Sequence, residues 1–334
     1  MGEVYKEIGQ EPIRLTLKDG ETIVGICFGH IVPAKRGKHL SVPYGPVLKE
    51  GIDRTDALRT IIDALTKIGK DQGCSFLRIS PFWSLQEGSR AQQAIGAKNA
   101  PMHLLAEHLW LLKLDRSEEE ILMAMRKTTR NLIRRAEKEG VTIEESKDPM
   151  NDLQHFIRLH DETRKRHHFT PYTNAFFRAQ VKNFSGHEPR CILYLAKYQG
   201  DVISASIHMH CGKETSYHHG ASSSAHSKIP ASYLLQWRAI QDAKKRGDRV
   251  YNFWGIAPQQ EERVASSDQR VDEEKLPATR YPQIAKHPFS GVTLFKTGFG
   301  GEVMNLAHCM DVPLSSRYYL TRGIEMVRKW RRGF

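Results

Sequence analysis

The sequence has no long hydrophobic run, and its few cysteines form no recognisable pattern. No segment approaches the roughly 18 consecutive apolar residues that a membrane-spanning helix needs, and the N-terminus lacks the apolar core of a secretion signal. The five cysteines are odd in number and include no C-x-x-C pair, which argues against a disulfide framework and against a zinc site. We therefore expect a soluble, cytoplasmic protein that uses neither a metal nor an organic cofactor.

Acidic residues are in the minority. The 334 residues include 38 Asp and Glu against 50 Lys and Arg, a formal net charge of +12. Such an excess attracts a polyanion or an anionic membrane surface, although an ordinary solvated surface explains it equally well. The length favours two domains rather than one.

Two segments concentrate the positive charge. Residues 117–140, "SEEEILMAMRKTTRNLIRRAEKEG", begin with a capping motif and end at a glycine, which predicts one amphipathic helix. Its residues Arg126, Arg130 and Arg134 recur every four positions and should form a basic stripe. The C-terminal residues 322–334, "RGIEMVRKWRRGF", mix cations with aromatic side chains and could lie on a phosphate backbone or on a membrane surface.

An internal repeat indicates the architecture. A strand, a loop, a helical pattern, a glycine and a second strand follow one another around residues 45–73, and again around residues 220–247. Each unit follows strand-like runs, so we predict an α+β fold with two related domains, each an antiparallel sheet that opens to a crossover helix and a further strand. Residues 258–286 are polar, charged and without periodicity, and are interpreted as a long loop, either a lid or a surface insertion.

The stretch "GVTLFKTGFGG", residues 291–301, places a lysine in an apolar, strand-like run. A buried ammonium must be paired or neutralised. Lys296 is therefore either a strand-edge lysine paired with a local carboxylate or a lysine that meets an anionic substrate. On a strand, Phe295 and Lys296 point to opposite sides, so one should belong to the core and the other to a site.

Six further residues are candidate substrate contacts: Tyr217, His219, Tyr251, Trp254, Arg166 and Tyr172. The first two lie two apart on a predicted strand, which should aim both side chains into one cleft. Tyr251 and Trp254 on a later strand could line the same cleft, and Arg166 and Tyr172 could contact phosphates or carboxylates. Core packing is the alternative for the aromatic and histidine side chains.

Several motifs in a fixed order carry a family resemblance. They are "TTRNLIRRAEKEGV", "YHHGAS", "ASYLLQWRAIQDAKKRG", "VYNFWGI" and "HPFSGVTLFKTGFGG". Together they resemble the FemABX family, bacterial aminoacyltransferases that build peptidoglycan cross-bridges, although the long helical arm of some members is missing here. The resemblance implies two tandem acetyltransferase-like (GNAT-like) domains, each a mixed sheet flanked by helices. It assigns residues 1–146 and 308–334 to the first domain and residues 147–307 to the second.

The resemblance also implies a reaction. An amino acid would pass from aminoacyl-tRNA to an amine of a peptidoglycan precursor stem peptide, in its nucleotide-linked or lipid-linked form. Lys296 and Phe295 would lie at the reaction centre, and Arg126, Arg130 and Arg134 would bind tRNA. We expect a monomer, with a peripheral contact at the inner face of the plasma membrane through the basic C-terminal helix as a further possibility.

Two alternatives stay open. An acyl-CoA-dependent N-acyltransferase would share the fold, but it normally carries a glycine-rich pyrophosphate loop before its helix, whereas the turn here reads "SSAHSKIPAS". A non-catalytic protein that binds RNA or a membrane surface would use the basic helices and would not need Lys296.

Overall fold

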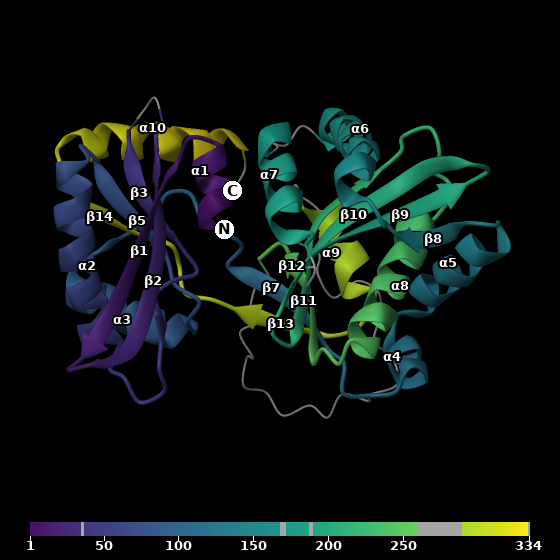
Figure 1. The fold of residues 1–334 in the computed structure, drawn as a ribbon, viewed down its shortest axis with the longest axis horizontal. Helices are drawn as coiled ribbons and strands as arrows, with labels where there is room; N and C mark the ends of the chain where they lie inside the picture. Colours follow the sequence, from purple (N-terminus) through teal and green to yellow (C-terminus); the bar gives the residue numbers. More distant parts are fainter. Residues whose placement is uncertain (35–36, 168–171, 187–189, 259–288, 333–334) are drawn as a thin grey trace, which may run out of the picture.

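The strands form two mixed sheets (Figure 1). Apart from the last strand, the strands of the first sheet precede those of the second in the sequence. The computed structural model describes residues 1–34, 37–167, 172–186, 190–258 and 289–332. The first sheet has the order β1-β2-β3-β5-β14-β6, with β4 paired to β2. Its strands are β1 (Glu11–Asp19), β2 (Thr22–Val32), β3 (His39–Pro43), β4 (Val47–Leu48), β5 (Phe76–Ser80), β6 (Lys98–Asn99) and β14 (Met310–Pro313). Around it lie α1 (Gly2–Glu7), α2 (Arg54–Asp71), α3 (Leu85–Ile95) and α10 (Arg317–Arg332).

The second sheet has the order β13-β7-β12-β11-β10-β9-β8. Its strands are β7 (His108–Lys113), β8 (Thr142–Glu145), β9 (Cys191–Tyr198), β10 (Asp201–Cys211), β11 (Glu214–Ser222), β12 (Val250–Gly255) and β13 (Glu302–Asn305). Its helices are α4 (Glu118–Ala124), α5 (Lys127–Lys138), α6 (Pro149–His167), α7 (Asn174–Phe184), α8 (Ala231–Lys245) and α9 (Ser290–Thr297). The predicted α+β architecture of two mixed sheets with flanking helices is confirmed.

The predicted repeat is also present. In the first sheet β3 and β5 pair in parallel and are connected through α2, and in the second sheet β11 and β12 pair in parallel and are connected through α8. Each crossover helix ends just before a glycine with positive φ, Gly73 or Gly247. A glycine adopts this conformation without the Cβ clash of other residues, so it ends the helix at the same place in both units.

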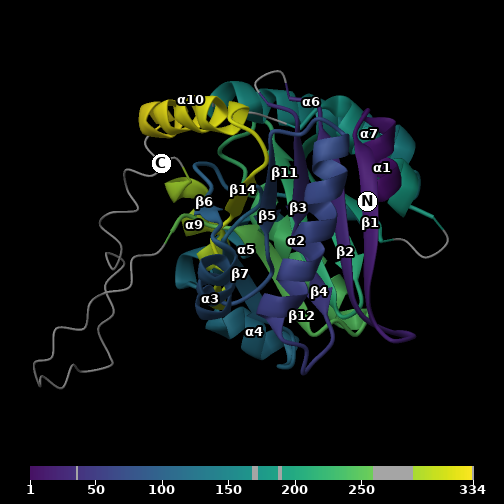
Figure 2. The ribbon, with the colours of Figure 1, turned by 90° about the vertical axis from the view of Figure 1, so that its left-hand side faces the viewer.

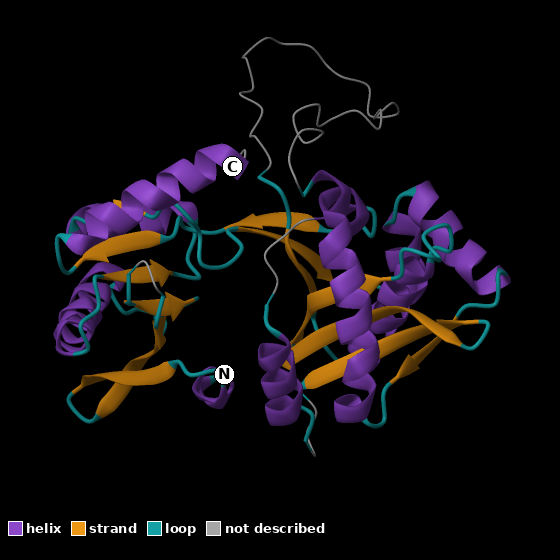
Figure 3. Cartoon of the chain, turned by 90° about the horizontal axis from the view of Figure 1, so that it is seen from above, coloured by secondary structure: helices purple, strands orange, loops and turns teal. Residues whose placement is uncertain are grey.

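The core of the second sheet has two sides. Along β9, Ile192 and Tyr194 belong to a cluster with residues of α5 and α8, whereas Leu193 and Leu195 belong to a cluster with residues of α6 and α7. Side chains alternate across a strand, so an uninterrupted apolar run fills both faces of the sheet. Figures 1 and 3 show the two helical layers on opposite sides of these strands.

The sequence-based division at residue 146 differs from the strand pairing. β7 pairs with β12 and β13, and β8 pairs with β9, so residues 108–145 contribute strands to the second sheet rather than to the first. β14 pairs with β5, so the chain returns to the first sheet near its C-terminus. We therefore propose that the boundary between the two units lies between β6 and β7.

The basic segment forms two helices rather than the single helix predicted. The expected capping box is present at its start, where Ser117 and Glu120 bond reciprocally. The helix breaks between Met125 and Arg126, and the backbone N–H of Arg126 donates to the O of Gly298, 2.9 Å away. A tertiary partner thus satisfies an N–H group at the helix break, which local periodicity does not reveal.

The run around Lys296 is helical, so the strand prediction for it is wrong. α9 contains two buried residues, Thr293 and Lys296, which lie three positions apart and therefore on one side of a helix. The predicted loop 258–286 lies outside the described residues from residue 259 onwards.

Candidate active site

Lys296 is almost completely buried, with an exposed fraction of 7%. Its Nζ donates a hydrogen bond of 2.6 Å to the backbone O of Gly255 and lies 5.8 Å from the ring centre of Tyr217. No carboxylate among the described residues forms an ion pair with Lys296, and burial lowers its pKa to about 7. The local carboxylate considered from the sequence is therefore not found in the described part of the chain.

The lysine lies where two strands have separated. The parallel pairing of β11 with β12 ends at Ser216 and Asn252. Gly255, which accepts the hydrogen bond from the amine, and Tyr217, whose ring faces it, come after those last paired positions. α9 thus brings an amine to the end of the parallel pair, and the ring of Tyr217 supplies a weakly attractive face for the cation.

Tertiary contacts at both ends hold α9 in place. Near its start, the Thr293 hydroxyl accepts a hydrogen bond of 2.9 Å from the backbone N–H of Ala257, just beyond β12. Near its end, the Arg126 guanidinium donates to the Thr297 hydroxyl at 2.8 Å. A side chain at Gly298 would collide with α5, so this position requires a glycine for the close approach of the two helices.

Phe295 packs away from the amine. Its ring meets the rings of Tyr233 and Phe299 edge to face, with centroids 4.9 and 5.4 Å away, and it borders the apolar cluster beneath α8. Strand alternation was expected to turn Phe295 and Lys296 to opposite sides. The separation instead arises from the 100° step between neighbouring residues of a helix.

Tyr217 and His219 do not point into one cleft. An irregularity in β11 pairs His208 with Tyr217 but the adjacent Ile207 with His219. Because neighbouring residues of a strand face opposite sides, this bulge turns Tyr217 and His219 to opposite faces of the sheet. Tyr217 faces Lys296, whereas His219 packs against Phe177 with ring centroids 4.9 Å apart.

Tyr251 belongs to the interior. Its side chain is fully buried, its hydroxyl donates to the Oε1 of Gln236 at 2.7 Å, and the Nε2 of His208 lies 2.8 Å from the same hydroxyl. These bonds satisfy the phenol where water cannot reach it. The packing alternative therefore describes Tyr251 better than a place in the cleft wall.

Trp254 contacts the first unit through a residue that the sequence argument did not single out. Its ring lies 5.6 Å from that of Tyr44, whose hydroxyl donates to the O of Ala106 at 2.7 Å. Both aromatic residues have positive φ, +67° for Trp254 and +50° for Tyr44. Non-glycine residues seldom adopt this conformation, and such strain is concentrated at functional sites. The tyrosine before Gly-Pro in "VPYGP" is the only sequence signal for it.

Aromatic contacts continue from Trp254 along β11. His218 packs edge to face against Trp254, with centroids 4.8 Å apart, and burial lowers its pKa to about 4. His218 is therefore neutral at pH 7 and packs as an aromatic ring. It also contacts His219, whose ring lies 5.3 Å from that of Tyr172. Rings from both units thus form one connected series from Tyr44 to Tyr172.

Arg166 and Tyr172 both contact residues at or near the C-terminal end of β11. Arg166 on α6 donates to the hydroxyls of Ser224 and Ser222 at 3.0 and 3.1 Å. Tyr172 is 46% exposed and stacks on Phe176 at 4.5 Å. Tyr172 is therefore part of the series of ring contacts, whereas Arg166 forms hydrogen bonds with serines of β11 and of the turn after it.

The three arginines of the basic segment differ in their surroundings. Arg126 bonds to α9 as described, and Arg130 donates to the backbone O of Met123 at 2.8 Å, at the end of α4. Arg134 is exposed and has no hydrogen-bond partner among the residues that the structure describes. Two of the three guanidinium groups thus support local structure, and tRNA binding by this set stays a prediction.

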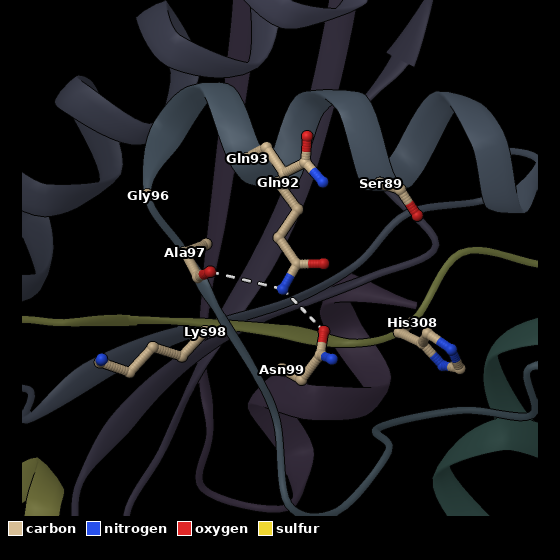
Figure 4. A pocket seen from close by; sticks show the side chains of 8 residues that line it. All are labelled: Ser89, Gln92, Gln93, Gly96, Ala97, Lys98, Asn99 and His308. Carbon is tan, nitrogen blue, oxygen red and sulfur yellow. Dashed lines mark hydrogen bonds between the residues drawn. The ribbon is translucent and has the colours of Figure 1, made fainter.

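A separate surface hollow of about 440 Å³ lies beside α3 and β6 (Figure 4). Gln92 donates there to the Oδ1 of Asn99 at 2.6 Å, and none of the predicted site residues lines this hollow. Within the described ranges, no cluster of three or more His, Cys, Asp or Glu could hold a metal ion. In the same ranges no helix has the length and apolarity to cross a membrane.

The comparisons with known proteins concern the fold. The profile of an acetyltransferase (GNAT) domain matches residues 123–262, whereas no curated protein matches the sequence. The chain is 16% identical to FemX, with 97% of this chain and 92% of that chain covered and a TM-score of 0.72. It is 14% identical to L-PGS from Bacillus licheniformis, with 99% of this chain and 93% of that chain covered and a TM-score of 0.55. It is 12% identical to a tandem GNAT protein from the clavulanic acid biosynthesis pathway, with 92% of this chain and 84% of that chain covered and a TM-score of 0.54. The chain therefore has the tandem GNAT-like fold.

Proposed function

We propose that the protein is an aminoacyltransferase that moves an amino acid from aminoacyl-tRNA to an amine of a peptidoglycan precursor stem peptide. The observation that carries the proposal is Lys296, a buried amine with no carboxylate partner in the described part of the chain and a pKa of about 7. The FemABX-like motifs around it, within a tandem GNAT-like fold, support this class of substrate.

The chemistry requires little from the protein, because the ester is already activated. The neutral acceptor amine attacks the ester carbonyl, forms the C–N bond of an amide, and displaces the ribose hydroxyl of the tRNA, which receives the proton that the amine loses. Negative charge develops on the carbonyl oxygen during this step. Positioning of the two substrates and stabilisation of that oxygen are the main tasks.

Lys296 suits the second task. With a pKa near 7, the amine is present in both its neutral and its charged form around neutral pH. A developing oxyanion beside the amine favours the charged form, so the attraction is strongest in the transition state. The bond to the Gly255 carbonyl and the ring of Tyr217 hold the amine in place before the substrate arrives.

We assign roles to the remaining candidate site residues from their positions in the fold. Tyr217, Trp254 and Tyr172 would contact the stem peptide, and Arg166 would contact carboxylates of that peptide or phosphates of the acceptor. The basic surface around Arg134 would contact the tRNA backbone. His219 and Tyr251 would support these residues from within the sheet rather than contact substrate.

One alternative is favoured by a specific observation, the match of residues 123–262 to an acetyltransferase domain. An acyl-CoA-dependent N-acyltransferase would need backbone N–H groups around a pyrophosphate before α8. The turn there contains no glycine between Gly220 and Ala231, the first residue of α8. Calorimetric titration with acetyl-CoA distinguishes the two functions, and we expect no binding heat.

The decisive assay supplies both substrates. The protein is incubated with tRNA charged with each labelled amino acid in turn, and with nucleotide-linked or lipid-linked precursor, and the products are weighed by mass spectrometry. We expect one or a few amino acids to give a precursor heavier by one residue. Absence of product with every pair, from protein shown to be folded, contradicts the proposal.

A further inference from the structure

The C-terminal helix α10 is attached to the first unit by one side. Tyr318 is fully buried and Thr321 is 5% exposed. One turn further on, Glu325 accepts hydrogen bonds of 2.7 and 3.1 Å from the guanidinium of the buried Arg78. Because these three residues are spaced by three and four positions, they lie on one side of the helix, and that side faces the sheet.

The opposite side of α10 is apolar and exposed. The exposed fractions of its large residues lie between 51% and 81%, for Tyr319, Leu320, Met326, Val327 and Trp330. With 3.6 residues per turn, these positions form one stripe on the side away from Tyr318. A surface helix normally presents polar residues to water and apolar residues to the protein, so this pattern is reversed. An exposed apolar surface of this kind marks an interaction site.

Cations border the stripe. The helix contains six basic residues and a single acidic one, Glu325, which forms an ion pair with Arg78 on the attached side. Arg317, Arg328 and Arg331 are exposed and lie along one edge of the stripe by the helical period. An apolar stripe with a cationic edge is the pattern of helices that lie in the plane of an anionic membrane.

The position of the helix permits such a contact. Figures 1 and 2 show α10 along one outer edge of the molecule, and in Figure 3, seen from above, none of the described helices and strands covers it. A flat surface can therefore meet the stripe along its length.

Other occupants fit the stripe less well. In a symmetric dimer the same patch of two copies would meet, which would bring the cations of both copies together. A nucleic acid backbone would satisfy the arginines but would leave Leu320 and Val327 without an apolar contact.

We propose that α10 binds peripherally to an anionic lipid surface, with its apolar stripe among the headgroups and Arg317, Arg328 and Arg331 on anionic lipid phosphates. The proposal concerns where the protein binds and does not depend on the reaction proposed above. Anionic lipid attracts each basic side chain near its surface, and salt weakens this attraction.

The test is flotation of the full chain with vesicles of phosphatidylcholine alone or mixed with phosphatidylglycerol. We expect binding to the mixed vesicles that exceeds binding to the neutral ones by about tenfold or more and that falls as salt is raised. A stripe variant, Leu320→Ser with Val327→Ser and Trp330→Ser, should lose about tenfold or more of this binding. A control variant replaces three other apolar residues that are more than half exposed, Ile26→Ser, Val47→Ser and Met123→Ser, and should bind as the unchanged protein does.

A second variant tests the charge without changing the stripe, namely Arg317→Gln with Arg328→Gln and Arg331→Gln. We expect its binding to mixed vesicles to fall about tenfold or more at low salt. The proposal is overturned by any of three results. These are no binding to mixed vesicles, equal binding by the stripe variant and its control, or a dimer in sedimentation equilibrium that the stripe variant dissociates.

Discussion

Among the residues that the structure describes, each unit buries one Lys or Arg side chain, and the two differ in the partners that they meet. In the first sheet, Arg78 is 5% exposed and meets two carboxylates, with bonds of 2.8 and 2.9 Å to Asp311 and of 2.7 and 3.1 Å to Glu325. Burial alone would lower the pKa of Arg78, but the hydrogen bonds to the carboxylates outweigh it and the pKa lies above its ordinary value. In the second unit, Lys296 is equally buried and bonds to one backbone carbonyl.

The difference separates a structural cation from one available for chemistry. Arg78 ties β5, β14 and α10 together, and its charge is used up by partners within the protein. Burial lowers the pKa of Lys296, and no carboxylate among the described residues offsets this effect, so an anion that arrives beside the amine would favour its charged form. We therefore expect replacement of the first cation to damage stability and replacement of the second to damage activity.

The largest effect on stability should follow Arg78→Met. The change leaves the fully buried Asp311 without its main partner, and loss of one member of a buried pair typically costs about 3–5 kcal/mol. Urea unfolding measures this loss. The matched control is Arg54→Met, which removes an exposed ion pair with Glu87 and should change stability by less than about 1 kcal/mol. Similar losses in both variants would contradict the structural role.

Lys296→Met should change stability in the opposite direction. Replacement of a buried charge by an apolar side chain of similar length often stabilises a protein, here by about 1–3 kcal/mol near neutral pH. The folded amine titrates near pH 7, whereas an unfolded lysine titrates near 10.4. The folded state therefore pays for a buried charge fully below pH 7, and this penalty falls as the pH rises from about 7 to 10.4.

The advantage of the variant should accordingly be largest at about pH 6 and smaller at about pH 9. Urea unfolding at the two pH values measures it. The control is Lys244→Met, because Lys244 also donates to a backbone carbonyl, that of Leu114 at 2.9 Å, but is only partly buried. An advantage of Lys296→Met that is equal at both pH values would show that the amine is not desolvated in the folded state.

A smaller effect concerns cations at the surface of the second unit. Replacement of Arg126, Arg130 and Arg134 by Gln should weaken tRNA binding by about tenfold and flatten its salt dependence, since about one counterion is released per phosphate contact. Filter binding over a range of salt measures both quantities. The control makes the same change of charge on the first unit, at Arg14, Arg54 and Arg59. An unchanged salt slope for the first variant would return these arginines to a purely structural role.

The sequence was sufficient for the architecture where local signals and tertiary structure agree. The two strand-helix-strand units were predictable because Gly73 and Gly247 end their helices by a local conformational need. The break at Met125 was not predictable, because the N–H of Arg126 finds its partner at Gly298, far along the chain. The helix around Lys296 was missed for a related reason, since short apolar runs fit a strand and a helix equally well.

The site was predictable in part. Lys296 stood out because a charged residue in an apolar run needs an explanation, and the structure brings it together with Tyr217. The pairing of Tyr217 with His219 failed because one extra residue in β11 reverses the side to which His219 points. Tyr44 was not singled out, because its only local signal is the Gly-Pro that follows it, and its contact with Trp254 joins residues far apart in the sequence.

The kinetics of Lys296→Met show whether Lys296 acts on the transition state, as we propose, or on substrate binding. Turnover by the variant should fall roughly 10²–10³-fold, as it does when a donor to an oxyanion is lost. The Michaelis constants for aminoacyl-tRNA and for the acceptor should change little, because the oxyanion is present only in the transition state. Unchanged turnover with a raised constant for aminoacyl-tRNA would instead make Lys296 a ground-state contact for the tRNA and contradict the account.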